Sequence, residues 1–323
     1  MRAAWYERTG PAAQVLAVGE MPTPEPGPGE VRIRLATSGI NPGDVKKRRG
    51  WMGATMPYPR VIPHSDGAGV IEAAGPHASD DRVGQRVWCY GAQSDRPFGT
   101  AAEYVCLPES QAVPLPPVVD DAQGACLGIP GITAHWAVHA DGPVAGQTIV
   151  VAGAAGSVGR AAVAFARRGG ATVIATVTHD PGGGAPRAHH VVDLANEPLE
   201  DAVRRILGRA SVDRVIEVAF GANAAADGAI LRPGGIIAAY ATDDPGAPFP
   251  FWPLLFNNVV VRLLGSDGFP PEVKAAGAHE CSRAAADRDL VYPIAARFPL
   301  EQIARAHEAV EHPAAPGRVI IDL

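Results

Sequence analysis

Three glycines at three-residue spacing are the strongest chemical signal in this 323-residue chain. They follow the apolar run 148–152, and the last of them lies at the start of the alanine-rich stretch 158–168. A strand that turns tightly into a helix needs glycine, and the free N–H groups of the helix N-terminus bind a pyrophosphate that the bare backbone lets approach. The pattern favours a dinucleotide site over a purely structural glycine turn. The predicted contacts in this loop are Gly153, Ala155, Gly156, Ser157, Val158 and Gly159.

The strand predicted at 171–177 bears on which dinucleotide binds. An NAD site usually has an Asp or Glu at the end of this strand, where it holds the ribose hydroxyls. Here the chain continues with Thr178 and His179, and the first carboxylate is Asp180. Thr178 and His179 are suited to hold a 2′-phosphate, and Arg187 could reach it. The sequence therefore favours NADPH as cofactor, with the alternative that His179 and Arg187 only face solvent.

The elements that must position these residues fall into two groups. From about residue 123 strands alternate with helices, which predicts a doubly wound parallel sheet. Residues 1–122 instead show short strand-like runs bounded by Gly and Pro turns, and residues 290–323 return to a strand–helix–strand pattern. We therefore predict an α/β protein with a β-rich domain, 1–122 joined by 290–323, and a dinucleotide-binding domain with its connecting segment, 123–289.

The composition excludes several classes of protein. Asp and Glu number 34 against 28 Lys and Arg, and the net charge of -6 argues against a charge-driven nucleic-acid binder. A hydrophobic fraction of 47% argues against disorder. The four cysteines are too few for a disulfide scaffold, and we find no apolar run of about 18 residues that would span a membrane. With no leader-like start, we expect a cytoplasmic protein.

The whole chain resembles the zinc-independent branch of the medium-chain dehydrogenase/reductases, and within it the NADPH:quinone oxidoreductases of the zeta-crystallin-like family. The matching segments are 38–44 (SGINPGD), 63–69 (PHSDGAG), 131–134 (GITA), 154–159 (AAGSVG), 231–235 (LRPGG) and 317–323 (GRVIIDL). The resemblance implies a GroES-like β-rich catalytic domain interrupted by a Rossmann domain. It also implies a homodimer that pairs through an edge strand of the Rossmann sheet, for which 259–264 is the candidate.

The resemblance also implies a chemistry without metal. Zinc-dependent relatives carry their ligands at positions that correspond to Asn41, Ser65 and about Pro130, and none of these is a good zinc ligand. Without a Lewis acid the substrate must itself accept hydride readily. We therefore expect an NADPH-dependent reductase of quinones, or alternatively of α,β-unsaturated carbonyls. An alternative of another class is an NADPH-binding protein with a structural or regulatory use.

Further site residues follow from the same resemblance. Asn41 would offer amide hydrogen bonds near the nicotinamide or substrate, or serve as a turn residue before Pro42. Asp44 is favoured as structural over a proton donor. Lys46 stands where relatives often have Tyr; it would stabilise a developing oxyanion, or belong to a solvated basic face at 46–49. Thr133 is expected near the nicotinamide carboxamide or substrate. The remaining predicted cofactor contacts are Val218, Ala219 and Ala241.

The histidines give weaker signals. His135 and His139 stand four apart and lack a third ligand, so core or helix-surface roles are favoured. His307 and His312 are one position too far apart for an H-E-x-x-H zinc motif. His64 lies in the segment 63–69, with a functional role and a core role both open.

Overall fold

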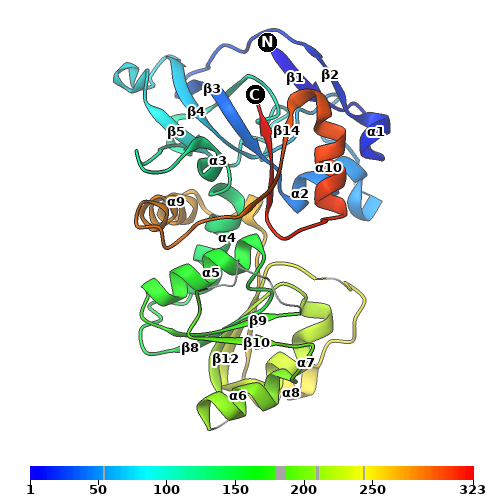
Figure 1. Ribbon diagram of the computed structural model, residues 1–323, viewed down its shortest axis with the longest axis vertical. Helices are drawn as coiled ribbons and strands as arrows, with labels where there is room; N and C mark the ends of the chain where they lie inside the picture. The colour runs from blue at the N-terminus through cyan, green and yellow to red at the C-terminus, as the bar shows by residue number, and fades with distance from the viewer. Residues whose placement is uncertain (54, 179–186, 209–210, 243) are drawn as a thin grey trace. The chain divides into compact units, whose positions relative to one another are not determined.

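The computed structural model describes residues 1–53, 55–178, 187–208, 211–242 and 244–323, and it divides into two compact units (Figure 1). Unit 1 comprises Met1–Ile132 and Pro270–Leu323, and unit 2 comprises Thr133–Phe269. The predicted ranges assign 123–132 and 270–289 to the dinucleotide-binding domain, whereas these segments belong to unit 1. Among the described residues no helix is long and apolar enough to cross a membrane.

Unit 1 is built on a seven-stranded sheet of order β14-β15-β3-β4-β5-β7, with β6 paired to β3. The strands are β3 (Glu30–Gly39), β4 (Asp66–Ala74), β5 (Arg86–Cys89), β6 (Tyr104–Pro108), β7 (Ala112–Pro114), β14 (Ile294–Pro299) and β15 (Arg318–Asp322). Val31, Ile33 and Leu35 of β3 are buried on alternate positions, the period of a strand with one face in the core. The C-terminal β15 pairs antiparallel with β3. The predicted β-rich domain is confirmed.

Shorter elements surround this sheet. A two-stranded sheet is formed by β1 (Arg2–Trp5) and β2 (Ala17–Glu20). The helices of unit 1 are α1 (Ala12–Val15), α2 (Pro42–Arg49), α3 (Asp121–Gly124), α9 (Pro271–Ala286) and α10 (Ile303–Glu311), and α4 (Gly128–His139) runs from unit 1 into unit 2.

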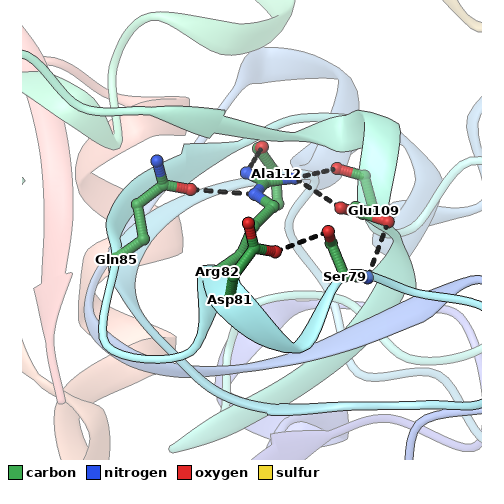
Figure 2. A network of polar contacts seen from close by, with 6 residues as sticks. All are labelled: Ser79, Asp81, Arg82, Gln85, Glu109 and Ala112. Atoms are coloured by element: carbon green, nitrogen blue, oxygen red, sulfur yellow. Dashed lines mark hydrogen bonds and ion pairs between the residues drawn. The ribbon is translucent and has the colours of Figure 1, made fainter.

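Arg82 fastens two connections of this sheet to each other (Figure 2). Its guanidinium donates to Gln85 Oε1 at 2.8 Å, and to the carbonyl of Glu109 at 3.0 Å. It also donates to the carbonyl of Ala112. On the other side Glu109 accepts the backbone N–H of Ser79 at 3.2 Å. The β4–β5 connection is thereby tied to the β6–β7 connection.

Unit 2 contains a six-stranded sheet of order β10-β9-β8-β11-β12-β13, and every pair in it is parallel. The strands are β8 (Thr148–Val151), β9 (Thr172–Val177), β10 (His190–Asp193), β11 (Val212–Glu217), β12 (Leu231–Ala239) and β13 (Val260–Leu263). Counted from β8, the order is that of the doubly wound dinucleotide-binding fold, with the direction of winding reversed between β8 and β11. The predicted α/β class is confirmed.

Helices cover both faces of this sheet (Figure 1). The helix α5 (Ser157–Arg168) packs on β8 and β9. The helices α6 (Leu199–Leu207), α7 (Phe220–Ile230) and α8 (Phe251–Phe256) share one apolar core with residues such as Val150, Ile174 and Val215. Strands buried on both faces explain the unbroken apolar runs in the sequence. The carboxyl ends of β8, β9, β11 and β12 therefore meet at one edge, where this class of sheet binds ligands.

Candidate functional site

The glycine loop joins β8 to α5 in unit 2. Gly153 takes a positive φ of 60°, which a residue with a side chain rarely adopts. The loop is closed by a hydrogen bond from Gly156 N–H to the carbonyl of Gly153 at 2.9 Å. It is tied to β9 by a bond from Ala154 N–H to the carbonyl of Thr176 at 3.0 Å. These bonds give the loop a fixed backbone in the place where the sequence predicts the pyrophosphate site.

Close packing explains why the last glycine of the motif has no side chain. A Cβ on Gly159 would lie 2.4 Å from the carbonyl oxygen of Gly153 and 2.8 Å from Cα of Ala154. Both neighbours are backbone atoms, so the helix could accept a side chain only by moving away from the loop. A Cβ on Gly156 would lie 3.2 Å from the same carbonyl oxygen. The glycines thus bring the helix start and the loop backbone together.

The start of α5 is a suitable anion site. Gly156 is the N-cap residue, and the helix extends over twelve residues from Ser157. The first N–H groups of an α-helix have no intrahelical partner and lie at the positive end of the helix dipole. Ala155, Ser157 and Val158 are only partly buried, so a ligand can approach their backbone. The residues present therefore fit the pyrophosphate of a dinucleotide, because the cradle at Gly156 and Gly159 is one that side chains would fill.

Most of the other predicted cofactor contacts lie at the same edge of the sheet. Thr178 follows the end of β9 and is exposed, while His179 lies outside the described residues. Arg187 is also exposed, but it precedes β10, and His189 N–H donates to the carbonyl of Val173 at 3.1 Å near the start of β9. Arg187 therefore lies toward the amino ends of these parallel strands, and the structure does not bring it to Thr178. Val218 and Ala219 follow β11, and a Cβ on Gly153 would lie 2.9 Å from Cγ1 of Val218.

Two more predicted contacts belong to other parts of unit 2. Ala241 lies beyond β12, and its carbonyl accepts the N–H of Phe220 at 3.3 Å. Thr133, the first residue of unit 2, is buried in α4. On the same helix the rings of His135 and His139 are tilted against each other with centroids 5.0 Å apart, and His135 packs edge-on against Phe165 of α5. A packing role accounts for this pair.

In unit 1, Asn41 is held at both ends of its side-chain amide. Its Nδ2 donates to Oδ2 of Asp66 at 2.7 Å, and its Oδ1 accepts from Nη1 of Arg318 at 2.9 Å. Its backbone N–H donates to Oδ2 of Asp44 at 2.7 Å, so Asp44 stabilises the start of α2. All four side chains are buried. The Asn41 side chain also accepts the backbone N–H of Asp44 in a capping box, so one amide hydrogen is left for a further partner.

Sequence reasoning missed Asp66 and Arg318 as members of this cluster. Asp66 also accepts the backbone N–H of Ile129 at 3.0 Å. Burial raises the pKa of Asp66 to about 7, although the charge of Arg318 and the hydrogen bond from Asn41 both lower it. Both residues lie in segments that carry the family resemblance, 63–69 and 317–323. A charged residue in an otherwise apolar strand such as RVIID was the available signal, since a buried charge requires a partner.

The basic run at the end of α2 is only in part a solvated face. Lys46 is exposed, and its Nζ lies 4.9 Å from the centroid of the Trp51 ring, a cation–π contact. Arg48, in contrast, is fully buried and pairs with Glu311 of α10 and with the carbonyl of Gly10. The interpretation of 46–49 as one solvated face is therefore wrong for Arg48. Among the residues that the structure describes, no three His, Cys, Asp or Glu side chains gather as a metal site.

Comparison with known proteins matches two stretches of the chain to known families. Residues 27–117 match the family described as alcohol dehydrogenase GroES-like domain, and residues 187–321 match that described as zinc-binding dehydrogenase. The first match confirms the predicted GroES-like domain.

Individual relatives cover nearly the whole chain. A quinone oxidoreductase of Sus scrofa is 30% identical over 307 residues, which span 92% of this chain and 90% of the relative. A 2-haloacrylate reductase of Burkholderia sp is 29% identical over 318 residues, 90% of this chain and 89% of the relative. A mycobacterial structure solved in complex with NADPH is 26% identical, with a TM-score of 0.84 and full coverage of both chains.

Proposed function

This chain belongs to the quinone oxidoreductase family of the medium-chain dehydrogenase/reductases, and from that premise we propose that it transfers hydride from NADPH to a quinone without zinc. The observation that carries the proposal is the cradle in unit 2, where the backbone of 153–159 meets the start of α5. A Cβ at Gly159 would meet backbone atoms there, so the residue types at this loop match what a pyrophosphate requires.

The chain's own groups divide the work of binding NADPH. The N–H groups at the start of α5 bind the pyrophosphate, and Thr178, beyond the carboxyl end of β9, holds the 2′-phosphate. Val218, Ala219, Ala241 and Thr133 contact the nicotinamide half. When bound, NADPH supplies a hydride from C4 of its nicotinamide ring. The NADPH in the mycobacterial structure, which is 26% identical to this chain, supports the choice of coenzyme.

We assign the contacts with the acceptor to residues of unit 1. Asp66, Arg318 and Asp44 fix the orientation of Asn41, whose free amide hydrogen then binds an acceptor oxygen. Lys46, held over Trp51, favours the negative charge that develops on that oxygen. Asn41 and Ser65 offer no good zinc ligand, which supports hydride transfer to an acceptor that needs no metal activation.

A second acceptor class is favoured by one relative. The 2-haloacrylate reductase acts, by its name, on an alkene conjugated to a carboxylate. Such an alkene accepts hydride at carbon, as a quinone does, so the same site serves an α,β-unsaturated carbonyl as the alternative substrate.

We also propose a homodimer and a reducing compartment. The edge strand β13 exposes Val260 and Leu263, the latter 73% exposed, as a pairing strand would. All four cysteines are free thiols, which suits the cytoplasm. The substitution Leu263→Asp places a charge on the edge strand β13 and should convert the dimer to a monomer, as measured by sedimentation velocity. A wild-type protein that is monomeric at micromolar concentration would contradict the proposed dimer.

The function is tested by steady-state oxidation of NADPH with a quinone and with an enone as acceptors. We expect turnover with the quinone that persists after chelation and without stoichiometric zinc. A preference for the enone in kcat/KM would select the alternative substrate class. Tight NADPH binding with no turnover of either acceptor would instead indicate a structural or regulatory protein, and zinc-dependent activity would contradict the metal-free mechanism.

A further inference from the structure

Two buried carboxyl groups face each other in unit 2. Glu217 ends β11 and is 0% exposed, and Asp227 lies on α7 and is 1% exposed. Their side chains are within hydrogen-bonding range. Yet Oε2 of Glu217 and Oδ2 of Asp227 have no donor among the described residues. Two ionised carboxylates cannot bond to each other, whereas one proton between them satisfies both oxygens.

The second oxygen of Glu217 holds the turn that follows β11. Oε1 accepts the backbone N–H of Ala219 in a short hydrogen bond, and it accepts Nδ2 of Asn223 at 3.1 Å. The backbone carbonyl of Glu217 accepts the N–H of Tyr240 at 3.0 Å. Glu217 therefore connects the turn at 218–219, the first turn of α7 and the segment after β12.

This turn belongs to the dinucleotide site. Val218 lies against Gly153 of the glycine loop, with Cγ1 2.9 Å from where a Cβ of Gly153 would stand. Phe220 N–H donates to the carbonyl of Ala241 at 3.3 Å, and Gly221 N–H donates to Oγ1 of Thr242 at 3.0 Å. A movement of the Glu217 side chain therefore shifts the predicted contacts Val218, Ala219 and Ala241, because these hydrogen bonds connect them to it.

We propose that Glu217 and Asp227 share a single proton and that the protonated pair positions the 218–219 turn for the cofactor. The role in positioning rests on the proposed NADPH site. Loss of the proton places a second charge on the pair, separates the two carboxylates and releases the turn, so NADPH binds more weakly. Glu217 and Asp227 are positioning residues, because they act on the cofactor through Val218 and Ala219.

The charged and titratable surroundings agree with this assignment. Burial and the neighbouring Glu217 raise the pKa of Asp227 well above its usual range. Burial and Glu217 also raise the pKa of Tyr240, which comes from the end of β12. The segment α8 faces α7 with an apolar sequence, FWPLLF. Other charges on β11 and α6 form their own pairs, Arg214 with Asp141, Asp213 with Arg232, Glu200 with Arg204 and Arg205 with Glu197, and Asp201 of α6 is exposed.

The test compares the dissociation constant for NADPH, measured by its fluorescence, from neutral to alkaline pH in four proteins. In Asp227→Asn the amide donates permanently to Glu217, so we expect wild-type affinity at neutral pH and no weakening as pH rises. Asp227→Ala leaves Glu217 without its donor. We expect about fivefold weaker NADPH binding at neutral pH, which is the change in affinity caused by the loss of one net hydrogen bond. Wild-type protein should approach that value at alkaline pH. Asp201→Asn, an exposed acid on α6, is the matched control and should follow the wild type.

Parallel pH profiles of the NADPH dissociation constant in wild type and Asp227→Asn would overturn the positioning role.

The shared proton is tested separately in the protein without cofactor, by its melting temperature. Because the pKa of Asp227 is raised in the folded state, its contribution to stability is lost as pH rises through that pKa. The melting temperature should therefore fall with pH more steeply in wild type and Asp201→Asn than in Asp227→Asn, and equal slopes would overturn proton sharing. Absence of NADPH binding by wild type at every pH would overturn the proposed function and the positioning role together, whatever the melting curves show for the proton.

Discussion

The Nε2 atoms of His64 and His307 lie 2.9 Å apart in the interior of unit 1. His64 Nδ1 lies 2.8 Å from Ser38 Oγ, which lies 2.8 Å from Thr100 Oγ1. Thr100 donates its hydroxyl proton to the carbonyl of Asp66 at 2.7 Å. Ser38 must then donate to Thr100, and His64 must donate to Ser38 through Nδ1–H. His64 Nε2 is left to accept from His307 Nε2–H, so both imidazoles are neutral.

This pair makes unit 1 sensitive to acid. Burial, and then the charge of Arg48, lowers the pKa of His307 to about 3. Burial, and then His307 and Arg318, lowers the pKa of His64 well below its usual range. Because a histidine in the unfolded chain titrates near 6.5, the stability of the pair is complete above about pH 6.5 and is lost as pH falls below it. We expect a loss of about 1.4 kcal/mol per pH unit per histidine in the free energy of unfolding.

The measurement is urea unfolding at a series of pH values. His307→Gln keeps a donor to His64 and removes one titrating group, so its stability should fall less steeply on acidification than that of wild type. His312→Gln, at an exposed histidine, is the control and should follow wild type. If the free energy of unfolding falls with pH at the same slope in His307→Gln and in wild type, the two buried histidines do not resist protonation.

The buried amide of Asn41 is expected to stabilise unit 1 independently of any catalytic use. Asn41→Leu leaves Oδ2 of Asp66 and Nη1 of Arg318 without this partner, and hydrogen bonds to charged groups are among the stronger ones. We expect a loss of about 3 kcal/mol in the free energy of unfolding. Asn196→Leu, at an exposed asparagine that bonds Asp193, should lose well under half of that. Similar losses in both variants would refute the account of the cluster.

The start of α5 gives a sharp test of the loop. A methyl group at Gly159 would lie 2.4 Å from the Gly153 carbonyl oxygen, so Gly159→Ala must push helix and loop apart. We expect a stability loss of about 1–3 kcal/mol from overpacking, and at least about tenfold weaker NADPH binding as the N–H groups move. Gly265→Ala is the control, since its Cβ would meet nothing within 4 Å. Unchanged affinity in Gly159→Ala, with the protein folded, would count against the pyrophosphate site.

Local patterns predicted most of unit 2. The apolar run 148–152 and the predicted strand 171–177 overlap β8 and β9, the alanine-rich stretch 158–168 forms most of α5, and strands alternate with helices from about residue 123 as predicted. These elements are determined by side-chain periodicity within a few residues, which a sequence displays directly.

Pairings across long sequence separations were not predictable in this way. His64 and His307 are 243 positions apart, and Arg48 meets Glu311 across 263 positions. A histidine or an arginine in a polar stretch gives no local sign that it is buried. Asp227 is a further case, because a single acid in an alanine-rich helix usually faces solvent, and only the tertiary fold places it beside Glu217.

Coenzyme preference tests the residues beyond β9. Thr178 is exposed and follows the carboxyl end of β9, at a position suited to a 2′-phosphate. A hydrogen bond to a charged group contributes about 1.5–3 kcal/mol, so Thr178→Val should lower the ratio of kcat/KM for NADPH over NADH by about tenfold to a hundredfold. The loss should lie in the NADPH value, because NADH lacks the 2′-phosphate. Arg187→Ala removes an exposed arginine near the amino ends of β9 and β10 and should leave the ratio unchanged. A wild-type preference for NADH, or an equal loss with both coenzymes, would show that Thr178 does not bind the 2′-phosphate.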